Sequence, residues 1–213
     1  MLLKDAFHLD TLQLSSINDS TFCGCSSLHQ IEIPSSVNSI GDTSFCECSS
    51  LKKIVIPSSV KSIGKRCFYK CTALESFQIS ESVKFIESST FECCSSLTKI
   101  TIPSSVVKIG NSAFKKCSLL EQITIPPSVT DIEASAFECC SSLKQITIPS
   151  SVTSIESFVF RGCSSLNKID IPNNVSSIKN SALEGCAKLA EVTIVSSVTL
   201  IVRCCQKLLF LLL

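Results

Sequence analysis

Hydrophobic and polar positions alternate along this chain in a pattern that returns every twenty-three residues. Each repeat has a phenylalanine, then a leucine that begins the string Leu-x-x-Ile-x-Ile-Pro, and then a valine with an isoleucine three residues later. The phenylalanines are Phe22, Phe45, Phe68, Phe91, Phe114, Phe137 and Phe160, and Leu183 takes the next place. A fixed period of this length predicts a repeat solenoid, in which near-identical coils stack on one another.

The local pattern within one repeat predicts the elements of each coil. Period-two alternation of β-branched residues, as in Leu143 to Pro149, indicates a short strand with one buried face. Proline ends this strand because it has no amide proton to donate to the next coil. A second extended piece, Val-x-x-Ile, follows. The stretch around Ala113–Phe114 has room only for a helical or 3-10 turn. Stacked strands lie about 4.8 Å apart, so the coils form a rod or shallow arc on the order of 40 Å long.

The repeat divides the chain into three predicted parts. Residues 1–16 are expected to form a degenerate N-terminal cap, residues 17–201 the solenoid of about eight 23-residue repeats, and residues 202–213 an apolar C-terminal cap or tail. Arg203, Gln206 and Lys207 interrupt the tail, so it lacks the roughly twenty apolar residues of a membrane span. We expect it to cover the last coil. The alternatives are an interfacial anchor and an exposed segment for self-association.

Charge argues against two classes of partner. The net charge is +1 and charged residues make up 17% of the chain, below the usual quarter. No basic field is therefore expected to attract nucleic acid or anionic lipid, and neither nucleic acid nor a membrane is a predicted partner. Residues 1–10 show no sustained apolar run, which excludes a secretory signal there and favours the cytoplasm.

The fifteen cysteines allow three interpretations. One cysteine per repeat follows the phenylalanine by three residues: Cys25, Cys48, Cys71, Cys94, Cys117, Cys140, Cys163 and Cys186. We expect this ladder to be buried and reduced, since cysteine packs as a small apolar residue. Disulfides are an alternative. A zinc site at Cys23, Cys25, Cys46 and Cys48 would lack the usual Cys-x₂₋₄-Cys spacing, so no metal or cofactor is expected.

No catalytic arrangement is visible in the sequence. The two histidines, His8 and His29, lie near no recurring nucleophile or carboxylate. Gly41, Gly64 and Gly110 follow the ladder isoleucine in a turn and do not form a phosphate-binding loop. We therefore expect that the protein is not an enzyme.

The string Ile-Pro-Ser-Ser-Val-x-x-Ile-x-x-x-x-Phe-x-x-Cys-x-x-Leu-x-x-Ile is cleanest in residues 102–124, 125–147 and 148–170. It resembles the BspA-like class of leucine-rich repeats. The resemblance implies a right-handed leucine-rich-repeat superhelix of short parallel β-strands whose Leu-x-x-Ile-x-Ile segments line a concave sheet. It also implies protein–protein or cell-surface recognition, as in surface antigens and adhesins, and so makes the cell surface an alternative location. Serine stands where ordinary leucine-rich repeats have asparagine, with Asn174 the exception.

If the resemblance holds, the outward residues of the predicted strands form the candidate binding face. They are Gln30, Glu32, Lys53, Val55, Ser76, Gln78, Lys99, Thr101, Gln122, Thr124, Gln145, Thr147, Lys168, Asp170, Glu191 and Thr193. The set is polar and lacks the Trp, Tyr and Arg favoured at interface hot spots. We expect a non-enzymatic module that binds a protein partner through this face. The alternative is a structural repeat protein without a specific ligand that self-associates through residues 202–213.

Overall fold

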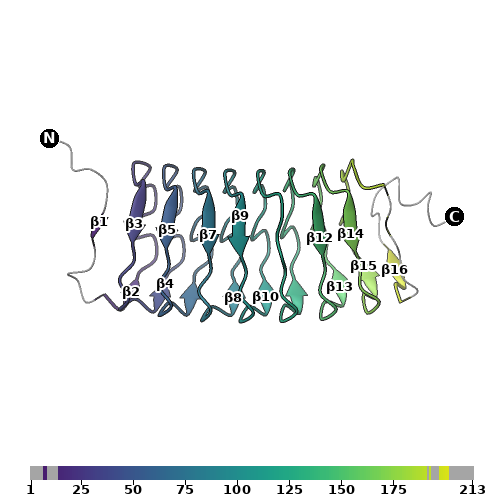
Figure 1. Cartoon of the computed structure of the whole chain (residues 1–213), viewed down its shortest axis with the longest axis horizontal. Coiled ribbons are helices and arrows are strands. Elements are labelled where there is room, and N and C mark those ends of the chain that lie inside the picture. The colour runs from purple at the N-terminus through teal and green to yellow at the C-terminus, as the bar shows by residue number, and fades with distance from the viewer. Residues whose placement is uncertain (1–6, 9–13, 191, 193–196, 202–213) are drawn as a thin grey trace.

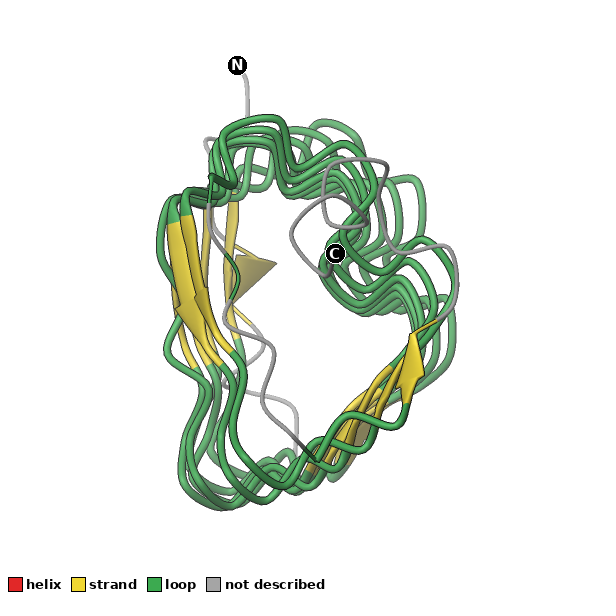
Figure 2. Ribbon diagram, turned by 90° about the vertical axis from the view of Figure 1, so that its right-hand side faces the viewer, coloured by secondary structure: helices red, strands yellow, loops and turns green. Residues whose placement is uncertain are grey.

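The chain folds into a parallel β-solenoid whose coils stack in a single row (Figure 1). The computed structural model describes residues 7–8, 14–190, 192 and 197–201. Two separate ladders of short strands run along the stack, and Figure 2, which looks along it, shows them on different sides of each coil. Every strand pair is parallel, and partners are twenty-three residues apart except at the first strand, where Phe7 pairs with Ile31.

Apart from its first strand, which lies within the residues expected to form the N-terminal cap, the first ladder comes from the predicted Leu-x-x-Ile-x-Ile segments. Its strands are β1 (Phe7–His8), β3 (Gln30–Glu32), β5 (Lys53–Val55), β7 (Ser76–Gln78), β9 (Lys99–Thr101), β12 (Gln145–Thr147) and β14 (Lys168–Asp170). From β3 onward, the central residue of each strand is buried and its two neighbours are exposed. The period-two prediction is confirmed.

The second ladder comes from the Val-x-x-Ile segments. Its strands are β2 (Ser16–Ile17), β4 (Ser39–Ile40), β6 (Ser62–Ile63), β8 (Phe85–Ile86), β10 (Lys108–Ile109), β11 (Asp131–Ile132), β13 (Ser154–Ile155), β15 (Ser177–Ile178) and β16 (Leu200–Ile201). Between the ladders, each Pro-x-x-Val segment forms a turn in which the valine N–H donates to the proline carbonyl, as in Val129 and Pro126 at 3.0 Å.

From Ser59 to Ser197, the residue before the valine, usually a serine, ties neighbouring coils together in this turn. Ser105 Oγ donates to the carbonyl of Val83 at 2.7 Å, and Ser128 makes the same bond to Val106. Asn174, the exception in this column, donates its amide to the carbonyl of Val152 at 2.9 Å. Serine and asparagine are therefore interchangeable here because both supply a donor to the preceding coil.

The phenylalanine column is a continuous stack of rings in the core. Neighbouring ring centroids from Phe22 to Phe160 lie 5.1–5.7 Å apart, and the ring planes differ by 2–12°. Phe45 through Phe160 are fully buried, whereas Phe22 at the end of the stack is only partly covered. Each coil thus buries its ring against its two neighbours, as expected for a solenoid.

The ladder cysteines lie beside this stack and use their thiols as donors. Cys117 Sγ donates to the carbonyl of Phe91, in the preceding coil, at 3.2 Å, and Cys48 through Cys186 all repeat this bond. Burial raises the pKa of Cys48 to about 12 and also raises the pKa of Cys94 and Cys140. None of the described cysteines from Cys23 to Cys163 forms a disulfide, and the ladder cysteines from Cys48 onward are buried.

The expectation of burial is wrong at Cys25, which is exposed. This residue belongs to the coil of Phe22, which is the first ring of the described stack, so its thiol has a stacked neighbour coil on one side only. Cys204 and Cys205, in contrast, lie outside the described residues.

The segment around each phenylalanine is a series of turns, and none of the described residues is helical. In each coil the residues two before and two after the phenylalanine, or Leu183 in its place, have positive φ: Ser112 at 55° and Lys116 at 61° flank Phe114. These left-handed residues interrupt any helix. Alternate N–H groups instead donate to the next coil, as from Ser112 to Ala134, Phe114 to Ala136 and Lys116 to Glu138 at 2.7–3.0 Å.

Charged residues in one column of these turns form ion pairs between coils. Lys115 contacts Glu138 at 2.8 Å, Glu138 contacts Arg161 at 3.6 Å, and Arg161 contacts Glu184 at 3.3 Å. Glu138 is buried. Burial opposes its ionisation, but hydrogen bonds from Lys115 and Ser135 and the charge of Arg161 outweigh this effect and hold the pKa of Glu138 below its ordinary value.

The predicted caps fall largely outside the described residues. Residues 1–6, 9–13 and 202–213 are not described, so the proposed C-terminal cover stays a prediction. Within the described part, β1 and β2 extend the two ladders at the N-terminal end, and β16 pairs with β15 near the other end.

Candidate binding face

The predicted outward residues form one exposed surface on the first strand ladder, which we call the strand face. Its described members, from Gln30 to Asp170, are all exposed. Glu191 and Thr193 lie outside the described residues. Because the strands pair in strict register, Gln145 aligns with Lys168 and Thr147 with Asp170, so equivalent positions form straight rows along the stack.

The ladder beneath the strand face is divided into separate sheets. Strands β1, β3 and β5 form one sheet, β7 and β9 a second, and β12 and β14 a third. Between β9 and β12, residues 122–124 make only an isolated bridge, from Gln122 to Gln145. In the described chain, no strand pairing connects β5 to β7 or β9 to the coil of Gln122.

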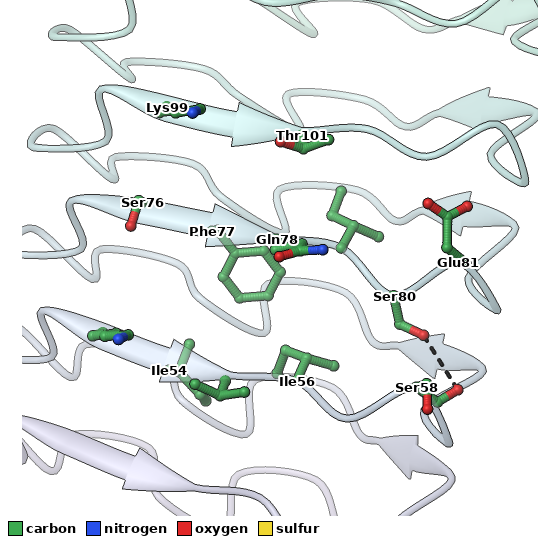
Figure 3. Close-up of a pocket in the computed structure, with 13 residues that line it drawn as sticks. Ile54, Ile56, Ser58, Ser76, Phe77, Gln78, Ser80, Glu81, Lys99 and Thr101 are labelled. Carbon is green, nitrogen blue, oxygen red and sulfur yellow. Dashed lines mark hydrogen bonds between the residues drawn. The ribbon is translucent and has the colours of Figure 1, made fainter.

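Hollows in the strand face coincide with these breaks. The first, of about 470 Å³, spans β5, β7 and β9 and is drawn in Figure 3. Its rim carries Ser76 and Gln78 on β7 and Thr101 on β9, and the buried side chains of Ile54 and Phe77 line it below. It is an open depression with a polar rim and an apolar floor.

The coil under this hollow departs from the repeat at two positions. Phe77 replaces the usual isoleucine, and its ring packs 4.9 Å from Phe68 and 4.8 Å from Phe91. Ser80 replaces the usual proline, is buried, and donates to the carbonyl of Ser58 at 3.4 Å (Figure 3). Ser80 and Glu81 line the hollow but were not among the predicted face residues. The missing proline was the signal in the sequence that could have identified them.

Two further hollows lie on either side of residues 122–124. One of about 610 Å³ is lined by Lys99, Thr101, Gln122 and Thr124, among others. The next, of about 350 Å³, is lined by residues that include Thr124, Thr147, Lys168 and Asp170. The central part of the strand face is therefore a row of uncharged hydrogen-bonding side chains with lysines on both sides.

The strand face carries exposed polar and charged side chains, which suit contact with another molecule. Its charged groups include the ion pair of Lys168 with Asp170 at 3.3 Å, which is well exposed and contributes little stability. Among the residues that the structure describes, no group of His, Cys, Asp and Glu side chains is arranged to hold a metal ion. The described part of the chain also contains no helix that is long and apolar enough to span a membrane.

Comparison with known proteins agrees with this architecture. The family model described as BspA type leucine rich repeat region matches residues 6–119 and 84–207, with six copies. A leucine-rich-repeat protein of T. pallidum is 25% identical with a TM-score of 0.57, and the match covers 84% of this chain and 72% of that one. A leucine-rich cell surface protein of Faecalibacterium prausnitzii is also 25% identical, with a TM-score of 0.45 over 87% of this chain and 78% of that one. No curated protein matches the sequence.

Proposed function

Because the chain belongs to the BspA-type leucine-rich-repeat family, we propose that it is a protein-binding module that recognises its partner through the strand face. The observation that carries this proposal is the coincidence of exposed, aligned side chains with hollows along one side of the stack. A partner segment lying across several coils would contact both the polar rows and the apolar floors. No catalytic step is proposed.

The composition of the strand face sets the expected mode of binding. Threonine and glutamine supply donors and acceptors, and the lysines supply separated positive charges. Large aromatic anchors, which dominate most tight interfaces, are missing from the described positions of the strand face. The affinity should therefore arise from many weak contacts over several coils, which favours recognition of an extended surface, as in adhesion.

A pair of matched threonine variants tests this proposal. Thr124 lies in two hollows of the strand face, whereas Thr153 is exposed next to β13 on the second ladder. The intact protein and the variants Thr124→Arg and Thr153→Arg are immobilised, and the proteins that each captures are quantified by mass spectrometry. We expect Thr124→Arg to reduce capture of the specific partner at least about tenfold, equivalent to about 1.4 kcal/mol. Thr153→Arg should capture it like the wild type.

Equal capture by all three proteins would contradict a role for the strand face. Light scattering on the same samples distinguishes the self-association alternative. A particle mass that rises with concentration and is unaffected by Thr124→Arg would favour that alternative.

A further inference from the structure

Two cysteines lie next to each other on the surface of adjacent coils, outside the buried ladder. Cys23 and Cys46 each follow the stacked phenylalanine of their coil by one residue. Cys23 is exposed and Cys46 is partly exposed. Burial raises the pKa of the Cys46 thiol to about 11, and the contact with the Cys23 side chain adds to this shift.

The backbone around this pair holds the two coils in register. On one side of Cys23, the N–H of Phe22 donates to the carbonyl of Ser44 at 2.7 Å. On the other side, the N–H of Gly24 donates to the carbonyl of Cys46 at 2.6 Å. The rings of Phe22 and Phe45 are 5.1 Å apart, so the coil spacing here falls within the Cα separation of about 4.4–6.8 Å that a disulfide requires.

We propose that Cys23 and Cys46 form an oxidation site that closes into a disulfide between the first two phenylalanine-containing coils. Cys23 and Cys46 hold the same position of adjacent coils, so their side chains project from the same side of the stack, and rotation about the Cα–Cβ bonds brings the two sulfur atoms toward each other. The exposed Cys23 is the entry point for an oxidant, and Cys46 is the resolving thiol.

The chemistry is thiol–disulfide exchange with a low-molecular-weight disulfide. The Cys23 thiol loses its proton, and its sulfur attacks the small disulfide, forming a mixed disulfide and releasing one thiolate. The Cys46 thiol then loses its proton, and its sulfur attacks Cys23 Sγ and displaces the second thiolate. Two protein thiols are oxidised by two electrons, and the small disulfide is reduced to two thiols that take up the two protons.

No other two described cysteines at the same position of adjacent coils are both at least partly exposed. From Cys48 onward the ladder thiols are buried and donate to phenylalanine carbonyls, as Cys48 does to Phe22 at 3.1 Å. Cys93 and Cys139 occupy one exposed column, but they are two coils apart with Lys116 between them. The bridge is therefore expected at one place, between the coils of Phe22 and Phe45.

The test uses the full chain treated with oxidised glutathione, followed by mass spectrometry of the intact protein and of its peptides without reduction. We expect a mass loss of two hydrogen atoms and a peptide that links Cys23 to Cys46. Cys46→Ser should instead accumulate one glutathione on Cys23. Cys139→Ser, the matched control, should bridge Cys23 to Cys46 like the wild type.

Hydrogen exchange then measures whether the disulfide stabilises the hydrogen bonds between the two coils. After bridging, exchange at the amides of Phe22 and Gly24 should slow by at least about tenfold, because both donate to the coil that is now linked covalently. The proposal is overturned if the wild type keeps glutathione on Cys23 while Cys46 stays reduced. It is also overturned if the bridge links Cys25 to Cys23 or Cys48, or if exchange at these amides is unchanged.

Discussion

Cys117 shows at the scale of one residue why a repeat column keeps one residue type. Its side chain is fully buried, and its thiol donates to the carbonyl of Phe91 in the preceding coil. Alanine would fill less space and leave this carbonyl without its thiol donor, whereas a larger side chain would separate the coils. The cysteine column is therefore both a packing column and a hydrogen-bonding column, and only the first role was apparent from the sequence.

Phe114 carries the first prediction at this scale. Its ring is fully buried between Phe91 and Phe137, at centroid distances of 5.5 and 5.4 Å. Phe114→Ala should lower the free energy of unfolding by about 3–5 kcal/mol, because it leaves a cavity in the stack. Phe22→Ala, at the partly covered end, should cost clearly less. Denaturant unfolding of both variants measures this, and a loss below about 1 kcal/mol at Phe114 would show that the ring is not part of the core.

Glu138 carries a prediction about acid stability. The pKa of Glu138 in the folded protein is below the ordinary 4.5. Its negative charge therefore stabilises the folded protein fully above about pH 4.5, and this stabilisation is lost as the pH falls through the folded pKa. Glu138→Gln should lower the free energy of unfolding at pH 7 by roughly 1–2 kcal/mol and flatten its decline below pH 4.5. Glu184→Gln, at an exposed position, is the control. Parallel acid profiles for the wild type and Glu138→Gln would refute this role.

At the scale of the elements, the strands were predictable and the turns were not. Buried isoleucines alternate with polar residues, so the period of two identified the first-ladder strands from β3 to β14, although residues 122–124 make only an isolated bridge. The left-handed positions around the phenylalanine gave no comparable signal, because Lys70, Lys116 and Glu47 stand where glycine would be the usual choice. The turns were therefore expected to be helical or 3-10. Their geometry depends on hydrogen bonds between coils, which a single repeat does not reveal.

Lys116 tests the left-handed turn. It has a φ of 61°, whereas Gly162 and Gly185 occupy the same column in later coils. Lys116→Gly should raise the free energy of unfolding by about 0.5–1 kcal/mol by removing the steric cost of this conformation. Lys116→Ala keeps a Cβ atom and should give no such gain. Thermal unfolding compares them, and a loss of stability in Lys116→Gly would show that the turn is not left-handed in solution.

At the scale of the whole molecule, stacking the coils places equivalent residues of the 23-residue repeat side by side on the strand face. Exact repetition let the sequence predict which residues share the strand face, since a constant period places equivalent positions in rows. The hollows were not predictable, because they depend on where neighbouring strands fail to pair. Only the replacement of proline by Ser80 hinted at one of them. The strand face thus combines regular rows of side chains, which the repeat predicts, with hollows, which the repeat does not predict.

The coils stack in register and bring the outward strand residues onto one face. Spin labels introduced at Lys53 and Lys168 through a ketone-bearing amino acid, which leaves the native cysteines unmodified, test this arrangement by pulsed electron resonance. These residues occupy the same position of β5 and β14.

Five coil spacings separate them, so we predict one narrow distance distribution centred at about 24–27 Å. Because both labels project from the same face, their linkers displace the two spins in the same direction, and the distance between the spins stays close to the distance between the two backbone positions. A broad distribution, or a mean beyond about 40 Å, would contradict the stack and with it the strand face.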